Sequence, residues 1–247
     1  MKIIRNIPGA VKGYYALRYL TEYKKEIDAA RAAGEMERER AAILKATTTW
    51  GSKLSQLMGI DITVIGRENL PKEGPVLYVS NHQGYADIVV LCAALDTIQF
   101  SFVTKMELAK VPLYGRWIDR VRAIFMARED LRASLQSIKN GIEYIQMGFS
   151  LLVFPEGTRS HGPKMGEFKA GAFKLATKPG VPIVPVSLNG TYRTFEERGV
   201  MTGGKVQILI HPPVPTKGIT REQERDLPEQ IKEIIQGGLD ILLEMES

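Results

Sequence analysis

The sequence contains a single cysteine, Cys92, which lies in an apolar stretch. One thiol cannot form an intramolecular disulfide, and it cannot supply the several thiolates of a cysteine-rich metal site. Besides His82, the only histidines are His161, in a loop rich in glycine and proline, and His211, which precedes two prolines. We expect both to be solvated or capping residues. The composition predicts no metal centre, and it fits a reducing cytosol.

Long apolar runs are also absent. The longest stretch without a charged residue is 179–192, which has 14 residues and three prolines. A membrane-spanning helix needs about 20 apolar residues. The first residues also lack the apolar core of a secretory signal. We therefore expect a chain that neither crosses a bilayer nor is exported.

Three common catalytic fingerprints are missing. The sequence has no Gly-x-Ser-x-Gly elbow, no Gly-x-x-x-x-Gly-Lys-Ser/Thr loop and no Gly-x-Gly-x-x-Gly motif. These motifs position, respectively, a nucleophilic serine, the phosphates of a nucleotide and a dinucleotide. Their absence counts against a serine hydrolase, a P-loop enzyme and a dinucleotide-dependent enzyme.

Positive charge is concentrated at the N-terminus. Residues 1–25 contain six basic residues and one acidic residue, so their net charge of +5 equals that of the whole chain. The remaining residues balance, which argues against a nucleic-acid-binding surface. Tyrosines mixed with basic residues suit the headgroup layer of an anionic membrane, and this segment has four: Tyr14, Tyr15, Tyr19 and Tyr23. The alternative is a helix that packs on the core and has a solvated face.

The chain length suits one large α/β domain with a small appendage. Apolar spacing predicts helices over Gly9–Ala33 and Glu35–Met58, separated by the helix breaker Gly34. We expect residues 1–58 to form a helical hairpin that anchors the protein at a membrane interface. Residues 59–247 then form the catalytic α/β domain.

From residue 59 onward, short apolar runs alternate with amphipathic stretches, which predicts an α/β fold with helices flanking a sheet. Several connections are too short for helical crossovers, so the sheet should be mixed and largely parallel. The predicted strands are Asp61–Ile65, Val76–Val79, Gln99–Val103, Ala123–Met126, Leu151–Phe154, Ile183–Leu188 and Val206–Ile210. The predicted helices are Asp87–Leu95, Met106–Ala109, Glu129–Met147, Phe168–Thr177 and Arg221–Met245.

His82 and Asp87 lie in the polar stretch 80–87, which follows the predicted strand Val76–Val79. Ligands bind at the carboxyl ends of strands in open α/β sheets. Five helical positions correspond to a rotation of about 140°, so the pair can meet only if His82 lies in the loop and Asp87 begins the helix. The carboxylate then accepts the Nδ1–H of the imidazole and leaves Nε2 free as a general base. The alternative is a helix-capping aspartate beside a core histidine.

A second polar turn, residues 155–160, follows the predicted strand Leu151–Phe154. Gly157 gives this turn backbone freedom, and Glu156 and Arg159 are expected to project towards the crevice that holds His82. The alternative is a solvated turn with an exposed ion pair. Two charged turns at strand ends of one domain favour the functional interpretation.

Four blocks of sequence together resemble the glycerolipid acyltransferases, most closely the 1-acyl-glycerol-3-phosphate (lysophosphatidic acid) acyltransferases. The blocks are Asn81-His82-(four residues)-Asp87, the weaker Ala123–Arg128, Phe154–Ser160 and Val181–Val186. The second block departs from the family pattern at Arg122, where glycine is usual, and at Ala127, where a charged residue is common. The resemblance covers about Gly66 to Ile210, and the two-helix N-terminus lies outside it.

The resemblance implies transfer of a fatty acyl group from an acyl-CoA or acyl carrier protein thioester to the sn-2 hydroxyl of lysophosphatidic acid. The product is phosphatidic acid, an intermediate of phospholipid synthesis, and no cofactor is involved. His82 is then the catalytic base and Asp87 its orienting partner, without a covalent enzyme intermediate. The protein would work at the cytoplasmic face of the cell membrane, as a peripheral or monotopic protein.

The implied substrate-binding residues are Glu156, Gly157, Thr158, Arg159, Lys105 and Arg128. The cations among them suit a phosphate, because guanidinium groups match it bidentately and lysine supplies a point charge. Glu156 either bonds an acceptor hydroxyl or holds Arg159, and the sequence leaves both open. Two other functions also remain open: an acyltransferase for glycerol-3-phosphate or another lysophospholipid, and a non-catalytic lipid-binding membrane protein.

Overall fold

The computed structural model of the chain describes residues 22–127 and 130–246. Within these ranges, seven strands form one sheet in the order β1-β7-β6-β2-β5-β3-β4. The strands are β1 (Ile60–Ile65), β2 (Leu77–Ser80), β3 (Phe100–Lys105), β4 (Ile124–Met126), β5 (Ser150–Val153), β6 (Ile183–Asn189) and β7 (Gly204–Ile210). Each strand begins and ends within two residues of the corresponding predicted strand.

The sheet is mixed and largely parallel, as the sequence predicts. Strands β4, β3, β5, β2 and β6 run parallel, whereas β7 runs antiparallel to β6 and carries the parallel edge strand β1. Besides a helix that includes residues 22–32, the described ranges contain the α-helices α2 (Met36–Met58), α3 (Asp87–Ala94), α4 (Tyr114–Arg120), α5 (Leu131–Gln146), α6 (Lys174–Thr177) and α7 (Arg221–Glu244). No helix in the described ranges combines the length and apolarity that a bilayer crossing requires.

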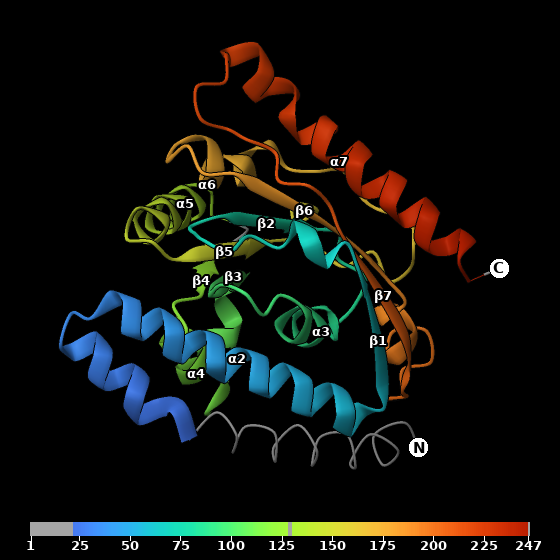
Figure 1. Cartoon of the computed structure of the whole chain (residues 1–247), viewed down its shortest axis with the longest axis horizontal. Coiled ribbons are helices and arrows are strands. Elements are labelled where there is room, and N and C mark those ends of the chain that lie inside the picture. The colour runs from blue at the N-terminus through green and yellow to red at the C-terminus, as the bar shows by residue number, and fades with distance from the viewer. Residues whose placement is uncertain (1–21, 128–129, 247) are drawn as a thin grey trace.

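Helices cover both faces of the sheet. In Figure 1, α5, α6 and α7 lie on one face and α2, α3 and α4 on the other. The alternation of side chains along β2 supplies both layers: Tyr78 packs with the α2 and α3 side, whereas Leu77 and Val79 pack with the α5 to α7 side. A strand with two buried faces reads as a continuous apolar run, and this is why β2 was predictable.

The described part of the N-terminal segment forms a helical hairpin with α2. Residues 22–32 are helical, and Ile27 and Ala30 are completely buried. The Tyr23 hydroxyl lies 3.3 Å from the Thr49 hydroxyl of α2. The first part of the predicted helix Gly9–Ala33 lies outside the described residues.

Several predicted helices differ from those observed. The prediction missed α4, which begins directly after Leu113, a leucine with a φ of +66°. Residues Met106–Lys110 form a 3₁₀ helix, and predicted helix 168–177 is a 3₁₀ turn followed by the single turn of α6. Short segments without a full amphipathic period give a weak helical signal, which explains these differences.

Arg122, the residue that departs from the family's glycine, has a φ of +60°. This left-handed conformation favours glycine, so the family pattern has a conformational reason. Here the guanidinium donates two hydrogen bonds of 2.8 Å to Glu39 of α2 and lies over the Phe149 ring. Burial alone would raise the pKa of Glu39, but Arg122 and Arg31 hold it below its ordinary value. Arg122 therefore adopts an unfavourable backbone conformation, and its ion pair with Glu39 links the turn before β4 to α2.

His211 is half-buried, which corrects the expectation of a solvated or capping residue. Its Nε2 lies 2.8 Å from the Ser187 hydroxyl, which donates to the Ile235 carbonyl of α7. Because that hydroxyl donates elsewhere, the His211 Nε2–H is the donor to the Ser187 hydroxyl. Burial lowers the pKa of His211.

Acid should therefore weaken the fold through His211. As the pH falls, the unfolded chain binds a proton on His211 near the ordinary pKa of about 6.5, whereas the native state binds it only at a lower pH. The contribution of His211 to stability is therefore present above about pH 6.5 and is lost as the pH falls towards the lowered native pKa. We expect the free energy of unfolding, measured in urea at pH 8 and pH 5, to fall less for His211→Gln than for the unmodified chain. Equal falls would contradict this account.

Candidate active site

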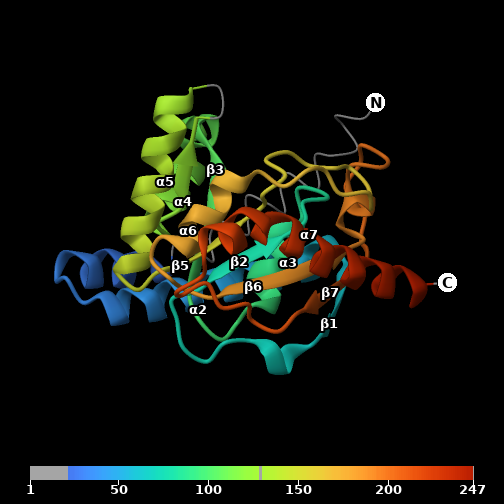
Figure 2. The same cartoon turned by 90° about the horizontal axis from the view of Figure 1, so that it is seen from above.

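The site forms where parallel strands end. Because β2 pairs with β5 on one side and β6 on the other, the segments that follow these three strands meet at one edge of the sheet. Figure 2 shows the segments after β5 and β6 extending to the same side. A cavity of about 1000 Å³ opens there, lined by His82, Phe154, Arg159 and 30 other residues.

His82 and Asp87 form the predicted pair. His82 lies in the loop after β2, and Asp87 is the first residue of α3. The His82 Nδ1 lies 2.6 Å from Asp87 Oδ2, and the carboxylate is completely buried. A carboxylate accepts, so Nδ1 carries the hydrogen and Nε2 has a free lone pair. Nε2 has no hydrogen-bond partner among the described residues, and His82 lines the cavity.

The Asp87 carboxylate is held by more than the imidazole. Its oxygens also accept hydrogen bonds from the backbone N–H groups of Gln83 and Gly84, at 2.7 to 3.1 Å, and from the Thr191 hydroxyl. These donors satisfy both carboxylate oxygens and hold the carboxylate in one orientation. Thr191 was absent from the sequence prediction because it follows β6, more than 100 residues from Asp87.

Asn81 fastens the histidine loop to β6. Its side-chain amide donates to the Leu188 carbonyl and accepts from the Leu188 N–H, each at 2.8 Å. The next residue but one, Gln83, accepts a 2.9 Å hydrogen bond from the Gly190 N–H. Both side chains are buried. The loop therefore has fixed ends, and His82 projects from a rigid frame.

Glu156 holds the backbone of His82. Its Oε1 accepts the His82 N–H and its Oε2 accepts the Gly166 N–H, both at 2.7 Å. The Ser160 N–H donates to the His82 carbonyl at 2.7 Å. Burial raises the pKa of Glu156, whereas the two backbone donors favour its charged form. The turn after β5 therefore bonds both the backbone N–H and the backbone carbonyl of His82. The sequence analysis did not consider this role for Glu156.

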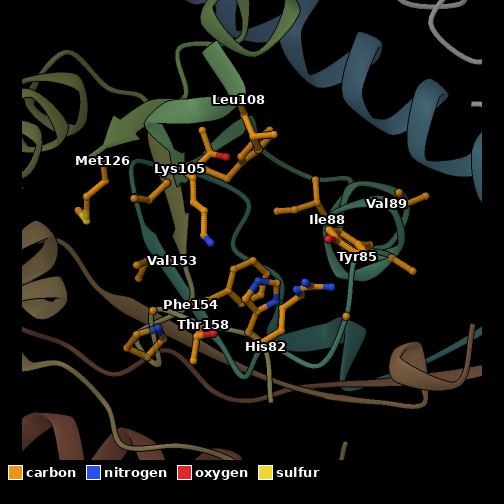
Figure 3. A pocket seen from close by; sticks show the side chains of 18 of the residues that line it. His82, Tyr85, Ile88, Val89, Lys105, Leu108, Met126, Val153, Phe154 and Thr158 are labelled. Atoms are coloured by element: carbon orange, nitrogen blue, oxygen red, sulfur yellow. The ribbon is translucent and has the colours of Figure 1, made fainter. Parts of the chain in front are cut away.

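The same turn packs against the imidazole ring. Phe154 stacks on His82, with ring centroids 4.1 Å apart and an interplanar angle of 13°. Gly157 has a φ of +70°, and a Cβ atom at this position would lie 2.8 Å from the Lys169 Nζ. Thr158 is exposed to the cavity beside His82, as Figure 3 shows.

Arg159 is held by Glu196 rather than by Glu156. Its Nη1 donates to Glu196 Oε1 at 2.7 Å, and its guanidinium lies 3.6 Å from the centroid of the Tyr85 ring. Glu196 also accepts the Tyr85 N–H at 2.8 Å and is almost completely buried. The sequence analysis missed Glu196 because it stands in a charged run, Glu196-Glu197-Arg198, that is typical of a solvated surface. No local signal marks it as buried.

Two lysines add positive charge to the cavity. Lys105 extends from the end of β3 and points into the cavity (Figure 3). Lys169 also lines it but was not predicted as a site residue, because the sequence analysis placed it in the predicted helix 168–177, where no motif marks it. Arg128, the remaining predicted cation, lies outside the described residues. In the described ranges, no cluster of three histidine, cysteine or acidic side chains is placed to hold a metal ion.

Comparison with known families bears on this geometry. The acyltransferase family model matches residues 61–189, more than half of the chain, including the histidine loop and the turn after β5. The chain belongs to the acyltransferase family. The resemblance inferred from the four blocks is thereby confirmed at the level of the family.

Curated relatives of this acyltransferase carry consistent names. The chain is 36% identical over 152 residues to the chloroplastic 1-acyl-sn-glycerol-3-phosphate acyltransferase of Brassica napus, covering 60% of this chain and 44% of that protein. It is 30% identical over 182 residues to the human 1-acyl-sn-glycerol-3-phosphate acyltransferase alpha, covering 72% of this chain and 64% of that protein. The match thus spans less than half the length of the plant relative and under two thirds of the human one.

A solved structure resembles this chain over most of its length. The crystal structure of the 1-acyl-sn-glycerophosphate (LPA) acyltransferase PlsC from Thermotoga maritima superposes with a TM-score of 0.74 at 31% identity, covering 98% of each chain. The N-terminal helices of this acyltransferase therefore have a counterpart in that structure, although they lie outside the family model.

The cavity of this acyltransferase is largely apolar away from the cations. It runs from His82 between α3, β3 and α2 (Figure 3). Its apolar side chains include Leu54, Met58, Ile88, Val89, Phe102, Leu108, Val111, Met126, Ile138 and Val153. Such a lining favours a long hydrocarbon chain, whose transfer from water is favourable by about 0.8 kcal/mol per buried CH₂.

Proposed function

We propose that this protein transfers a fatty acyl group from an acyl-CoA or acyl carrier protein thioester to the sn-2 hydroxyl of 1-acyl-glycerol-3-phosphate, giving phosphatidic acid. The observation that carries the proposal is the His82–Asp87 pair, whose free Nε2 opens on a cavity that is apolar in one part and cationic in another. The names of the curated relatives and of the solved structure support the same reaction.

The geometry suits a direct transfer. His82 Nε2 removes the proton of the acceptor hydroxyl as its oxygen attacks the thioester carbonyl. The tetrahedral intermediate collapses when the carbon–sulfur bond breaks, and the imidazolium returns the proton to the leaving thiolate. Buried Asp87 stabilises the imidazolium between these steps. No enzyme nucleophile is needed, because the substrate hydroxyl takes its place.

The cations of the cavity support a binding site there for the acceptor phosphate. Arg159, Lys105 and Lys169 all line the cavity that contains His82. Arg159 donates a hydrogen bond from Nη1 to Glu196, and its other N–H groups are available for a phosphate oxygen. The apolar lining then accommodates acyl chains. Glu156, Gly157 and Thr158 complete this side of the site, with Glu156 acting through the backbone of His82.

Product analysis tests the function. The purified chain is incubated with acyl-CoA or acyl carrier protein thioester and a mixture of lysophosphatidic acid, glycerol-3-phosphate and neutral or zwitterionic lysolipids, and the products are identified by mass. We expect phosphatidic acid to dominate. Acylation of glycerol-3-phosphate or of another lysolipid would overturn the acceptor assignment, and binding of lipids without thioester turnover would identify a non-catalytic lipid-binding protein.

Arg159→Lys should separate acceptor binding from donor binding. Lysine keeps the charge but cannot bond Glu196 and a phosphate with one planar fork. Loss of a charge-assisted hydrogen bond, about 1.5–3 kcal/mol, should raise KM for the phosphorylated acceptor roughly tenfold or more and leave KM for the donor nearly unchanged. Arg198→Lys, at an exposed ion pair, is the matched control. Equal effects on both substrates would make Arg159 a structural residue.

We further propose that residues 1–58 anchor this enzyme to the cytoplasmic face of the cell membrane as a peripheral or monotopic protein, with residues 59–247 as the catalytic domain. The enzyme must reach an acceptor that resides in a bilayer. Residues 1–21 carry four basic and no acidic residues. The described part of this hairpin packs through α2 on the α3 face of the sheet.

Deletion of residues 1–21 should weaken binding to anionic vesicles. Each basic residue near the surface contributes about 1 kcal/mol, so a loss of at least about tenfold in affinity is expected at low salt. This deletion leaves Tyr23 and Ile27 in place against α2. Turnover of a water-soluble short-chain acceptor should be unchanged. Sedimentation with liposomes measures the loss, and undiminished sedimentation would contradict the anchor.

A further inference from the structure

Exposed apolar side chains surround the mouth of the cavity. Val111, Leu135, Tyr85 and Met201 line the cavity, and yet all four are exposed, Tyr85 to 65% and Leu135 to 49%. They come from the segment after β3, from α5, from the histidine loop and from the segment after β6. Single exposed apolar residues are ordinary, but a group from four segments around one opening marks an interaction surface.

The segment after β3 extends this apolar rim outward. Met106 and Leu113 flank Val111 in sequence and are exposed to 40% and 53%. In Figure 2 the segment after β3 and the start of α5 lie at the same edge of the molecule. We call residues 105–116, together with Tyr85, Leu135 and Met201, the mouth rim.

Leu113 is presented to solvent by an unusual backbone. Its φ of +66° and ψ of −49° belong to a γ-turn, closed by a 2.7 Å hydrogen bond from the Tyr114 N–H to the Pro112 carbonyl. A leucine rarely adopts this conformation, which is strained outside glycine. Strain that places a large apolar side chain in water points to a role for that side chain in binding.

Cations are interleaved with the apolar residues of the rim. Residues 105–116 contain Lys105, Lys110 and Arg116 against one acid, Glu107, which gives a local charge of +2 from 3 − 1. Lys110 and Arg116 are exposed, and neither forms an ion pair with another residue in the described ranges. Alternating cations and apolar side chains are typical of segments that lie in the headgroup layer of an anionic bilayer.

We infer that the mouth rim is a second membrane-contact surface, separate from residues 1–58, which inserts into the headgroup layer of an anionic bilayer so that the cavity opens directly onto lipid. The inference rests on the proposed function, because the lysolipid acceptor and its product both reside in the bilayer. Direct contact lets the acyl chain pass from the bilayer into the apolar cavity without entering water. Exposure of the chain to water would cost about 0.8 kcal/mol for each CH₂ group.

A fluorescent label at the rim tests the contact itself. Leu113→Cys is labelled with an environment-sensitive fluorophore; Cys92, the only native cysteine, is completely buried, and burial raises the pKa of its thiol to about 12, so it does not react. Ile241→Cys, on α7 and exposed to 51%, is the matched control. Vesicles of phosphatidylcholine with phosphatidylglycerol are then added to the full-length chain.

We expect a blue shift and a several-fold rise in emission at position 113, with quenching by lipids spin-labelled near the headgroup, and neither change at position 241. If the vesicles bind the protein but the label at 113 stays in water, only the N-terminal anchor contacts the bilayer and the inference fails. A response to acyl carrier protein alone, with none to vesicles, would make the rim a protein-docking surface and would also overturn it.

Leu113→Gly supplies a second, functional readout. Glycine accepts the positive φ, so this variant removes the side chain without straining the fold. We expect turnover of acceptor in vesicles to fall about three- to tenfold, while turnover of a monodisperse short-chain acceptor stays at the level of the unmodified chain; Ile241→Ala should change neither. An unchanged rate on vesicles would overturn the inference. Absence of turnover with every acceptor in the unmodified chain would instead count against the proposed function.

Discussion

His82→Ala is expected to abolish acyl transfer while the protein stays folded. A positioned general base typically contributes about 10²–10⁴ in rate, and no other described side chain has a free basic nitrogen at the end of β2. The alanine removes Nε2 but leaves the backbone of residue 82 bonded to Glu156 and Ser160. The measurement is kcat with thioester and lysophosphatidic acid, alongside the thermal midpoint.

His161→Asn is the matched control for this substitution. His161 is exposed in the loop after the Glu156 turn and has a φ of +60°, which asparagine tolerates better than most residues. It should retain full activity. Near-normal turnover by a well-folded His82→Ala protein would remove His82 from the mechanism and leave the cavity without a general base.

The His82–Asp87 pair was predictable because its information is local. Only four residues separate His82 from Asp87, the preceding strand is a continuous apolar run, and helical geometry forces the loop-then-helix arrangement that the structure shows. Likewise, the adjacency of the two polar turns follows from parallel strands ending at one edge of a sheet. These steps need only chain order and periodicity.

The residues that hold the pair were not predictable in the same way. Thr191 and Glu196 reach the site from the segment after β6, and their partners are Asp87 and Arg159. Their role depends on β6 lying beside β2, a pairing between strands separated by about 100 residues. A threonine after a strand and a glutamate in a charged run carry no sequence signal of their own.

Glu156 illustrates an intermediate case. The sequence indicated that it belongs to the site, but both roles considered for it involved its side chain reaching substrate or Arg159. The structure shows two backbone N–H groups as its partners instead. Backbone groups are the same in every residue, so a sequence pattern cannot identify which of them a buried carboxylate will choose.

Asp87→Asn is expected to lower kcat by about three to four orders of magnitude, because the amide cannot serve all the donors around it. One carboxylate accepts from the His82 ring, from the backbone N–H groups of Gln83 and Gly84 and from Thr191. In the variant only the amide oxygen accepts. If it faces the backbone donors, the NH₂ group faces Nδ1, selects the tautomer with hydrogen on Nε2 and removes the base.

The imidazolium also loses its buried counter-charge in this variant, so the intermediate is destabilised even when the ring keeps the right tautomer. Asp96→Asn, in an exposed ion pair with Arg67, controls for the loss of a carboxylate and should leave kcat unchanged. Because Asn is nearly isosteric, KM for both substrates should change far less than kcat, and this split distinguishes loss of the base from a collapsed loop. A variant that loses substrate binding as severely as kcat would show that Asp87 mainly maintains the histidine loop.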